Sequence, residues 1–292
     1  MTLQAFDTAL KTYGTMPLSK LMKPAIDYCM DGFAVRPRVH AFWLQPAQAG
    51  RIERVAVVNK LDAARKIYLH DDGTLLNIGE TLRNPDMGRL YQRIADEGVG
   101  VFYDGDVADQ IAADMKANGG LLTRDDLADC APTKIAPLKG SYRGFDVDTN
   151  QLPGGGLMII QMLNILEQFD LVAMGHNSAQ YIATVSEAMK LATIDKDANM
   201  GDPNFVDVPL ARLKSKERAA ETAAKIRAGD KANVVRVNSG AAESKDTTHL
   251  VVADTAGNIV NVTHSLGSSS GVITDGLGFM YNNCMMVFDP RP

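Results

Sequence analysis

The segment that most constrains the fold lies near the end of the chain and surrounds a single threonine. Residues 247–253, TTHLVVA, combine β-branched and apolar side chains as strands do, and Ile259 to Ser265 repeat this composition. The five residues between them, DTAGN, favour a turn. The sequence therefore predicts a β-hairpin. A register symmetric about its loop places Thr247 opposite Ser265, with Cβ atoms about 5 Å apart.

Thr247 is a candidate nucleophile. A threonine hydroxyl reacts poorly inside a chain, but at a chain's first position the α-amino group, whose pKa is near ~8, can act as its base. The preceding residues 237–246, VNSGAAESKD, are small and polar, and a chain can be cut in such a segment without damage to a core. A Thr-Thr pair also begins many strands for structural reasons, so these residues alone permit both interpretations.

The stretch TTHLVVADTAGNIVNVTHSLGSSSG resembles the start of the small subunit of γ-glutamyltransferases (γ-glutamyltranspeptidases). In that family the pattern TTH-x-x-V-x-D-x-x-GN begins the chain that self-cleavage produces. Further segments resemble the family in the same order along the chain: LKTYGTMPLSKLMKPAIDYCMDGFAV, FYDGDVADQIAADMKANGGLLTRDDL, QLPGGGLMIIQMLNILEQFDL, MGDPNFVDVP and GFMYNNCMMVFDPRP.

The resemblance implies an α+β fold, the αββα sandwich of N-terminal-nucleophile hydrolases. Residues 1–246 would be a large-subunit portion, mostly helical with strands, and residues 247–292 the start of the small subunit, so the sandwich is expected to be incomplete. Thr247 would be the nucleophile and supply the N-terminal amine base, and Asp246 would be the last residue before the cut. Ser265 would orient the nucleophile, and Thr248, the next residue of the strand, would be a further catalytic residue.

Three positions depart from the family's donor-binding pattern. Gly267 stands where many members have an asparagine, and Cys284 replaces a polar side chain. Val287 replaces an aspartate that holds the donor's α-amino group in typical members, and losing a charge partner weakens recognition strongly. These departures favour, as an alternative to a γ-glutamyl donor, an amide acylase with a non-glutamyl donor.

The expected activity is thus transfer of a γ-glutamyl group from a glutathione-type donor to water, an amino acid or a peptide, after self-cleavage before Thr247. The expected partners are these small molecules and the two subunits of one precursor. No cofactor or metal is expected. By resemblance the chain is an internal fragment whose oxyanion hole and donor-binding arginine lie outside it, so a catalytically inactive fragment or a binding module is a further alternative.

Composition narrows the remaining classes. The net charge is −5 with no basic cluster, which argues against a nucleic-acid surface. The three cysteines, Cys29, Cys130 and Cys284, lack metal-ligand spacing, and nothing near Cys284 in the sequence would activate its thiol. No apolar run reaches the roughly 20 residues of a membrane span. No pattern in these residues indicates the cellular compartment, and the resemblance alone points to a periplasmic or secreted protein.

Periodicity predicts the elements that surround the hairpin. The first ~50 residues are expected to be helical. Helices are also predicted over 84–97, 107–117 and 178–199, and a short one after Thr123. A nearly all-apolar helix over 157–166 should be buried and pack on a sheet. Residues 135–138 and 145–148 are predicted to pair as strands. His249, two residues after Thr247, should share its face and make a buried structural hydrogen bond.

Overall fold

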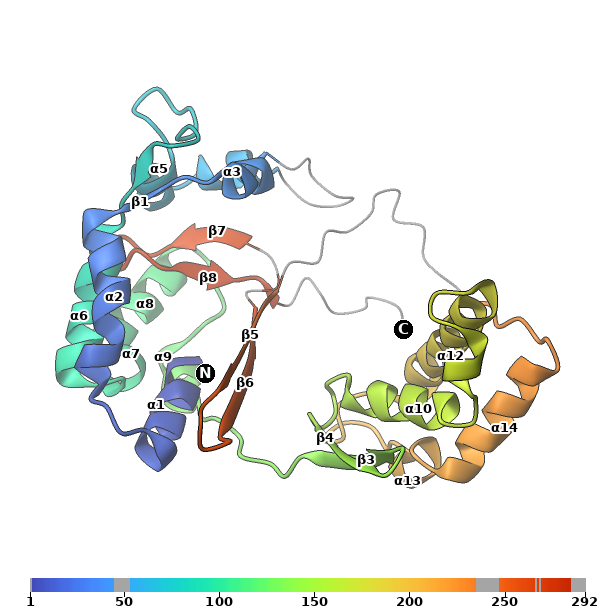
Figure 1. Cartoon of the computed structure of the whole chain (residues 1–292). Coiled ribbons are helices and arrows are strands. Elements are labelled where there is room, and N and C mark those ends of the chain that lie inside the picture. Colours follow the sequence, from blue (N-terminus) through green and yellow to red (C-terminus); the bar gives the residue numbers. More distant parts are fainter. Residues whose placement is uncertain (1, 45–52, 235–246, 266, 268, 285–292) are drawn as a thin grey trace. The chain divides into compact units, whose positions relative to one another are not determined.

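A computed structural model of the chain describes residues 2–44, 53–234, 247–265, 267 and 269–284. The chain divides into two units, Met1–Pro132 with Asn238–Pro292, and Thr133–Val237. Each unit is described by itself (Figure 1). These units are not the predicted subunit portions, which are defined by a cut before Thr247, and that boundary remains a prediction.

The first unit combines helices with short antiparallel pairs of strands. Its helices are α1 (Thr2–Tyr13), α2 (Leu18–Asp31), α3 (Pro37–Trp43), α4 (Arg54–Val58), α5 (Asp62–Tyr68), α6 (Pro85–Glu97), α7 (Gly100–Asp104), α8 (Asp106–Ala117) and α9 (Arg124–Ala128). Its strands are β1 (Phe33–Ala34), β2 (Thr81–Leu82), β5 (Thr248–Ala253), β6 (Ile259–His264), β7 (Ser269–Ile273) and β8 (Met280–Asn282). Strand β1 pairs with β2, β5 with β6, and β7 with β8. The predicted helices over 84–97 and 107–117 are therefore present.

The ends of these helices follow from local side chains. Asn84 caps α6, because its side chain accepts a hydrogen bond from the Met87 N–H, and Pro85 follows at the first helical position. Thr123 and Asp126 form a reciprocal capping box at the start of α9, where the sequence predicted a cap and a short helix. Such caps satisfy the free N–H groups of a helix's first turn.

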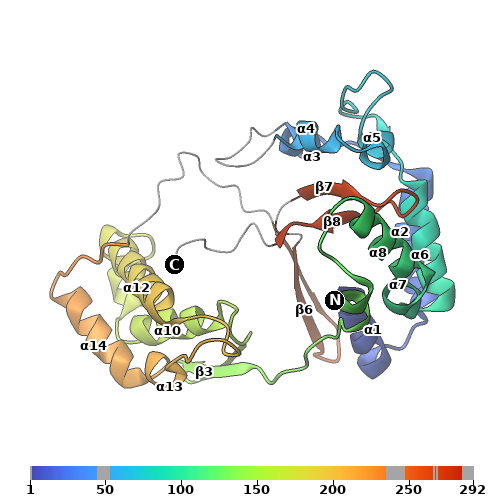
Figure 2. The same cartoon turned by 180° about the vertical axis from the view of Figure 1, so that it is seen from behind.

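The β7–β8 hairpin lies between two hydrophobic clusters of the first unit. Ile273 and Met280 pack in a cluster with α4 and α5, and Phe279 and Tyr281 pack in another with α6, α7 and α8. Neighbouring residues of a strand point to opposite faces, so Met280 and Tyr281 can serve different clusters. Figure 2 shows the hairpin beside α8 and beneath α4 and α5. Burial on both faces fixes this hairpin in the first unit.

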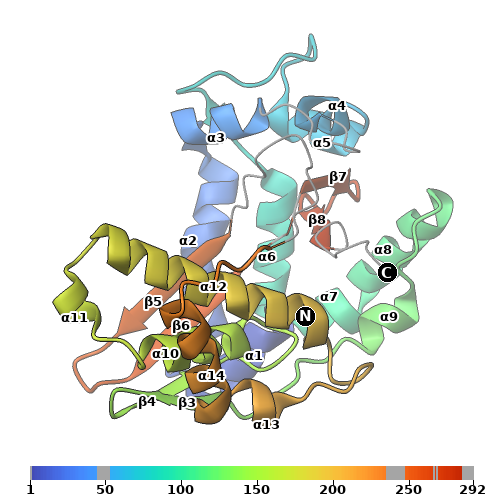
Figure 3. The same cartoon turned by 90° about the vertical axis from the view of Figure 1, so that its right-hand side faces the viewer.

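The second unit is a helical bundle with one hairpin. It contains β3 (Leu138–Tyr142), β4 (Phe145–Thr149), α10 (Gly156–Leu166), α11 (Leu171–Met174), α12 (Ala179–Asn199), α13 (Leu210–Leu213) and α14 (Lys216–Arg227). Helix α10 packs against α12, α14 and β3 (Figure 3). The hairpin turn at Arg143–Gly144 is as predicted, but β3 begins at Leu138 instead of Ile135, because its partner β4 pairs with residues 138–142.

Helix α10 is less buried than its composition predicts. Leu157 and Ile160 are fully buried, as are the polar Gln161 and Asn164, but Ile159 is 49% exposed. The described part of the unit therefore covers one side of α10, and the prediction of burial on every side is wrong for this face. Ser178 caps α12, in agreement with the predicted helix over 178–199.

The hairpin predicted around Thr247 is present. Strands β5 and β6 pair in antiparallel register from Thr248 opposite His264 to Ala253 opposite Ile259, and residues 254–258 form the loop. Asp254 holds this loop, because its carboxylate accepts hydrogen bonds from the N–H groups of Ala256 and Asn258. Within the described residues no helix is both long and apolar enough to cross a membrane.

Candidate active site

The hairpin brings together the two hydroxyl groups predicted to be neighbours. Thr247 directly precedes β5 and Ser265 directly follows β6, so they occupy the next position of the observed register. Thr247 Oγ1 lies 3.5 Å from Ser265 Oγ, and both residues are exposed. This separation exceeds the 2.7–2.8 Å typical of a hydroxyl–hydroxyl hydrogen bond, and catalytic contacts are often long before substrate binds.

Ser265 also orders the residues that follow it. Its Oγ accepts a hydrogen bond from the Gly267 N–H at 3.0 Å. The serine hydroxyl is thus shared between the candidate nucleophile and the backbone that continues toward β7. This hydrogen bond fixes the Ser265 hydroxyl relative to the backbone of Gly267.

Gly267 and Cys284 lie in contact with each other beside Ser265, and we call this pair the Cys284–Gly267 wall. Gly267 has φ +67°, and a Cβ added there would lie 2.8 Å from Cys284 Cα and 3.2 Å from Sγ. Only glycine fits this close approach without a backbone shift. Cys284 Sγ lies 4.0 Å from the Ser265 carbonyl oxygen, and the Cys284 N–H donates to Asn282 Oδ1 at 3.1 Å. Two of the three predicted departures from the donor site therefore lie together at Ser265.

The other predicted residues are placed differently. Alternation along β5 puts Thr248 on the opposite face from Thr247, where it pairs with His264. Asp246 and Val287 lie outside the described residues. His249 Nδ1 lies 2.9 Å from Thr263 Oγ1, which agrees with the expected structural hydrogen bond, but the side chains are exposed and not buried. The three cysteines are free, and among the residues described no group of three acidic, histidine or cysteine side chains could hold a metal.

The site has support that the sequence did not reveal. Thr274, 3% exposed at the end of β7, donates to Asp114 Oδ2 at 2.6 Å, and its Oγ1 lies 2.7 Å from the Tyr281 hydroxyl. Asn84 donates from Nδ2 to the Gly278 carbonyl at 2.7 Å, and Gln110 donates from Nε2 to the Asp275 carbonyl at 2.8 Å. Except for the Thr274–Tyr281 pair, these contacts join residues that are 160 or more positions apart in the sequence. No local sequence pattern marks them.

Burial affects one of these groups strongly. Desolvation raises the pKa of Tyr281 to about 12, the Thr274 hydroxyl opposes this rise, and the charge of Asp114 adds to it. Tyr281 is therefore a protonated hydrogen-bond donor throughout the neutral pH range.

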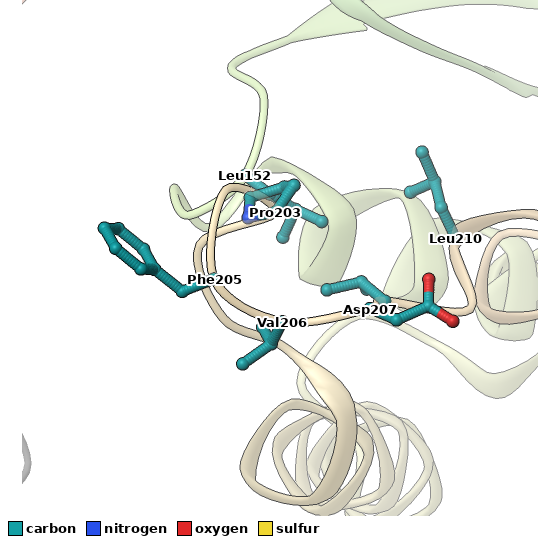
Figure 4. A pocket seen from close by; sticks show the side chains of 7 residues that line it. Leu152, Pro203, Phe205, Val206, Asp207 and Leu210 are labelled. Atoms are coloured by element: carbon teal, nitrogen blue, oxygen red, sulfur yellow. The ribbon is translucent and has the colours of Figure 1, made fainter.

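A surface cavity of about 430 Å³ occurs in the second unit (Figure 4). Seven residues line it: Leu152, Pro203, Phe205, Val206, Asp207, Val208 and Leu210. The side chains that line it are apolar except for Asp207, and none of them is a candidate nucleophile.

Comparisons with known proteins agree with the resemblance. The family model described as Gamma-glutamyltranspeptidase matches residues 2–292. A glutathione hydrolase proenzyme of Escherichia coli (strain K12) is 35% identical over 297 residues, covering 100% of this chain and 50% of the relative. An acylase ACY 1 proenzyme of Pseudomonas sp. (strain V22) is also 35% identical, covering 99% and 51%. The chain spans about half the length of these curated relatives.

Solved structures show the same fold. The crystal structure of Helicobacter pylori gamma-glutamyltranspeptidase matches with a TM-score of 0.71 and 31% identity, over 82% of this chain and 65% of that chain. The cephalosporin acylase from Bacillus halodurans matches with a TM-score of 0.78 and 27% identity, over 96% and 50%. The predicted α+β class of N-terminal-nucleophile hydrolases is thereby confirmed.

Proposed function

The chain belongs to the gamma-glutamyltranspeptidase family, and from this premise we propose that the full-length protein cuts itself before Thr247 and then uses Thr247 as its acyl-transfer nucleophile. The observation that carries the proposal is the pairing of the Thr247 and Ser265 hydroxyls at the open end of the β5–β6 hairpin. The relatives' description as proenzymes supports a processing step.

In the precursor, the Thr247 hydroxyl oxygen attacks the carbonyl carbon of residue 246. The peptide C–N bond breaks, the Thr247 nitrogen takes up the proton, and an ester joins the two parts. Water then cleaves the ester, which restores the hydroxyl, leaves a carboxylate on residue 246 and makes Thr247 a chain terminus. The new α-amino group, with a pKa near ~8, is partly unprotonated at neutral pH and can act as a base.

In turnover, the same hydroxyl attacks the acyl carbon of an amide donor. The α-amino group accepts the hydroxyl proton and passes it to the leaving amine, and the acyl group stays on Thr247 as an ester. Water completes hydrolysis, or the amine of an amino acid or peptide completes transfer. Ser265 orients the hydroxyl in both reactions. Hydrogen-bond donors must stabilise the developing oxyanion, and loss of one such donor typically lowers the rate by about 10²–10³-fold.

Two classes of acyl donor are compatible with the proposal, and each is favoured by a different feature. A γ-glutamyl donor of the glutathione type is favoured by the family. A non-glutamyl amide, as for an acylase, is favoured by the wall beside Ser265, where Gly267 has no side chain and a cysteine stands at position 284. A neutral or apolar acyl group suits such a wall better than the charged α-amino acid end of a γ-glutamyl group.

The test begins with the intact mass of the purified full-length protein. Two pieces separated between Asp246 and Thr247 support the proposal, and a single uncut chain contradicts it. Initial rates on γ-glutamyl-p-nitroanilide and on a neutral acyl-p-nitroanilide then separate the two donors. A Thr247→Ala variant that is still cut at this bond would overturn the assignment of the nucleophile.

A further inference from the structure

The candidate site is built from two hairpins that share no strand pairing. Strands β5 and β6 form one two-stranded sheet, with Thr247 and Ser265 at its open end, and β7 and β8 form another, which leads to Cys284. Gly267 and Cys284 continue the β7–β8 register beyond Ser269 opposite Asn282, and the two hairpins meet where Cys284 Sγ lies 4.0 Å from the Ser265 carbonyl oxygen. The distance between the Thr247 hydroxyl and the Cys284 wall therefore depends on how firmly the end of β8 is held.

A hydrogen-bond chain with a defined direction holds this end. Thr274 donates its hydroxyl proton to Asp114 Oδ2, so at its 2.7 Å contact with Tyr281 it accepts, and Tyr281 donates. The other carboxylate oxygen of Asp114 accepts from Asn118 Nδ2 at 2.8 Å. The order is thus Tyr281 to Thr274 to Asp114. Because Thr274 is buried and its partner is charged, both hydrogen bonds are strengthened.

The backbone of Tyr281 is held as well as its side chain. Ser270 Oγ donates to the Tyr281 carbonyl oxygen at 2.6 Å and accepts from the Val272 N–H at 3.1 Å. The Tyr281 ring packs on Phe279, with ring centroids 4.8 Å apart. Three residues further along, Cys284 meets Gly267. Tyr281 therefore helps to set the direction in which the chain leaves β8, together with Asn282.

We propose that Tyr281 and Thr274, acting through Asp114, are positioning residues that fix the Cys284–Gly267 wall of the acyl-donor site opposite Thr247. Neither residue touches the reacting atoms, and neither was marked by a pattern in the sequence. The inference rests on the proposed function, since the wall is a donor site only if Thr247 is the nucleophile. Because Asp114 lies on α8, this helix would influence how the acyl donor fits the site.

The experiment uses the full-length protein with three variants and one control. Thr274→Val removes both hydrogen bonds with little change of volume, Tyr281→Phe removes one, and Thr274→Ser keeps both. Tyr91→Phe, at a half-buried tyrosine of α6, is the matched control. The rate of self-cleavage, kcat and KM for the better acyl-p-nitroanilide, and the melting temperature are measured for each.

Thr274→Val and Tyr281→Phe are expected to raise the donor KM roughly three- to tenfold, the range that one or two hydrogen bonds support. Self-cleavage and kcat should stay within about twofold, because the hydrogen bonds of the β5–β6 hairpin are unchanged. Thr274→Ser and Tyr91→Phe should match the unmodified protein. An unchanged KM in both variants would overturn the proposal, as would an equal rise in Tyr91→Phe or a fall of kcat in step with the melting temperature.

A second measurement does not need turnover. Alkylation of each cysteine by iodoacetamide, followed by peptide mass, compares Cys284 with Cys29 and Cys130 in the same molecule. A loosened end of β8 should speed alkylation of Cys284 alone, roughly three- to tenfold, in Thr274→Val. An unchanged Cys284 rate contradicts the positioning role. If Cys284 alkylation is faster in Thr274→Val but the full-length protein neither cuts itself nor turns over, the positioning role is supported and the proposed function is refuted. Failure of the positioning role can therefore be distinguished from failure of the proposed function.

Discussion

Removal of the Ser265 hydroxyl tests the candidate site most directly. Ser265 Oγ has two contacts, with the Thr247 hydroxyl at 3.5 Å and with the Gly267 N–H at 3.0 Å. In Ser265→Ala both are lost. Because the site is exposed, water can replace the serine at the Gly267 N–H, and the free energy of unfolding should fall by less than about 1 kcal/mol.

The effect on rate should be larger than the effect on stability. A hydrogen bond that orients the nucleophile contributes about 0.5–1.5 kcal/mol. This corresponds to a roughly two- to twelvefold slower reaction. If one hydroxyl performs both reactions, self-cleavage and turnover should slow by similar factors, since both begin with its attack on a carbonyl carbon.

The assay follows both reactions in the full-length protein. The uncut fraction is followed by intact mass after synthesis, and initial rates are measured on an acyl-p-nitroanilide. Ser265→Thr keeps a hydroxyl and should retain most of both rates. Thr263→Ala is the matched control, because Thr263 lies two residues away on β6 and contacts His249 instead of Thr247. Unchanged rates in Ser265→Ala would refute the orienting role, and a loss of only one reaction would refute a shared nucleophile.

Three further predictions follow from the described contacts. Thr247→Ala should leave the full-length protein uncut and without turnover while its melting temperature stays within a few degrees, as intact mass and a thermal scan would show; activity in the uncut protein would contradict this. Gly267→Ala should cost about 1–2 kcal/mol of stability because its backbone is left-handed, and it should displace Cys284, so the donor KM should rise. Gly257→Ala is the control, because its backbone is also left-handed but an added Cβ would meet no atom within 4 Å. An equal KM in the two variants would show that the wall does not bind donor. Glu187 is buried, which raises its pKa, but hydrogen bonds from Lys190 and the Ala232 N–H outweigh burial and lower it. Its contribution to stability is therefore present above about pH 4.3, its ordinary value, and is lost as the pH falls through the lower folded value. Urea unfolding at pH 7 and pH 4 should show a weaker pH dependence in Glu187→Gln, and an equal dependence would contradict the assignment.

The parts of the fold that the sequence predicted depend on short-range rules. The register of β5 and β6 follows from alternation and a five-residue turn, and the start of α12 follows from the Ser178 cap. The contact between Cys284 Sγ and the Ser265 carbonyl oxygen could not be predicted in this way, because it depends on how two hairpins meet. The link from Asp114 to Thr274 joins residues 160 positions apart, and neither residue type is unusual at its place.

Burial of a side chain depends on distant segments as well as on its own helix. Ile159 was predicted to be buried because its helix is apolar all round, but composition cannot say which faces a partner covers. Glu187 on α12 has an acidic side chain and is nevertheless buried, because Ala232 returns to this helix and offers its N–H. In both cases the deciding group comes from a distant part of the chain.

The β5–β6 hairpin that carries Thr247 has exposed apolar side chains on both faces. Leu250 and Val252 lie on one face of β5 and Val251 on the other, and all three are 46–58% exposed in the described part of the chain. A two-stranded hairpin with two exposed apolar faces is marginal by itself, and surface of this kind is usually covered. Because the curated relatives are about twice as long as this chain, we expect other parts of the full-length protein to cover both faces. Thr247 lies at the end of the strand and not in its middle. Its hydroxyl can therefore stay open to a donor while the hairpin behind it is buried, and burial there would strengthen the electrostatic interactions on which acyl transfer depends.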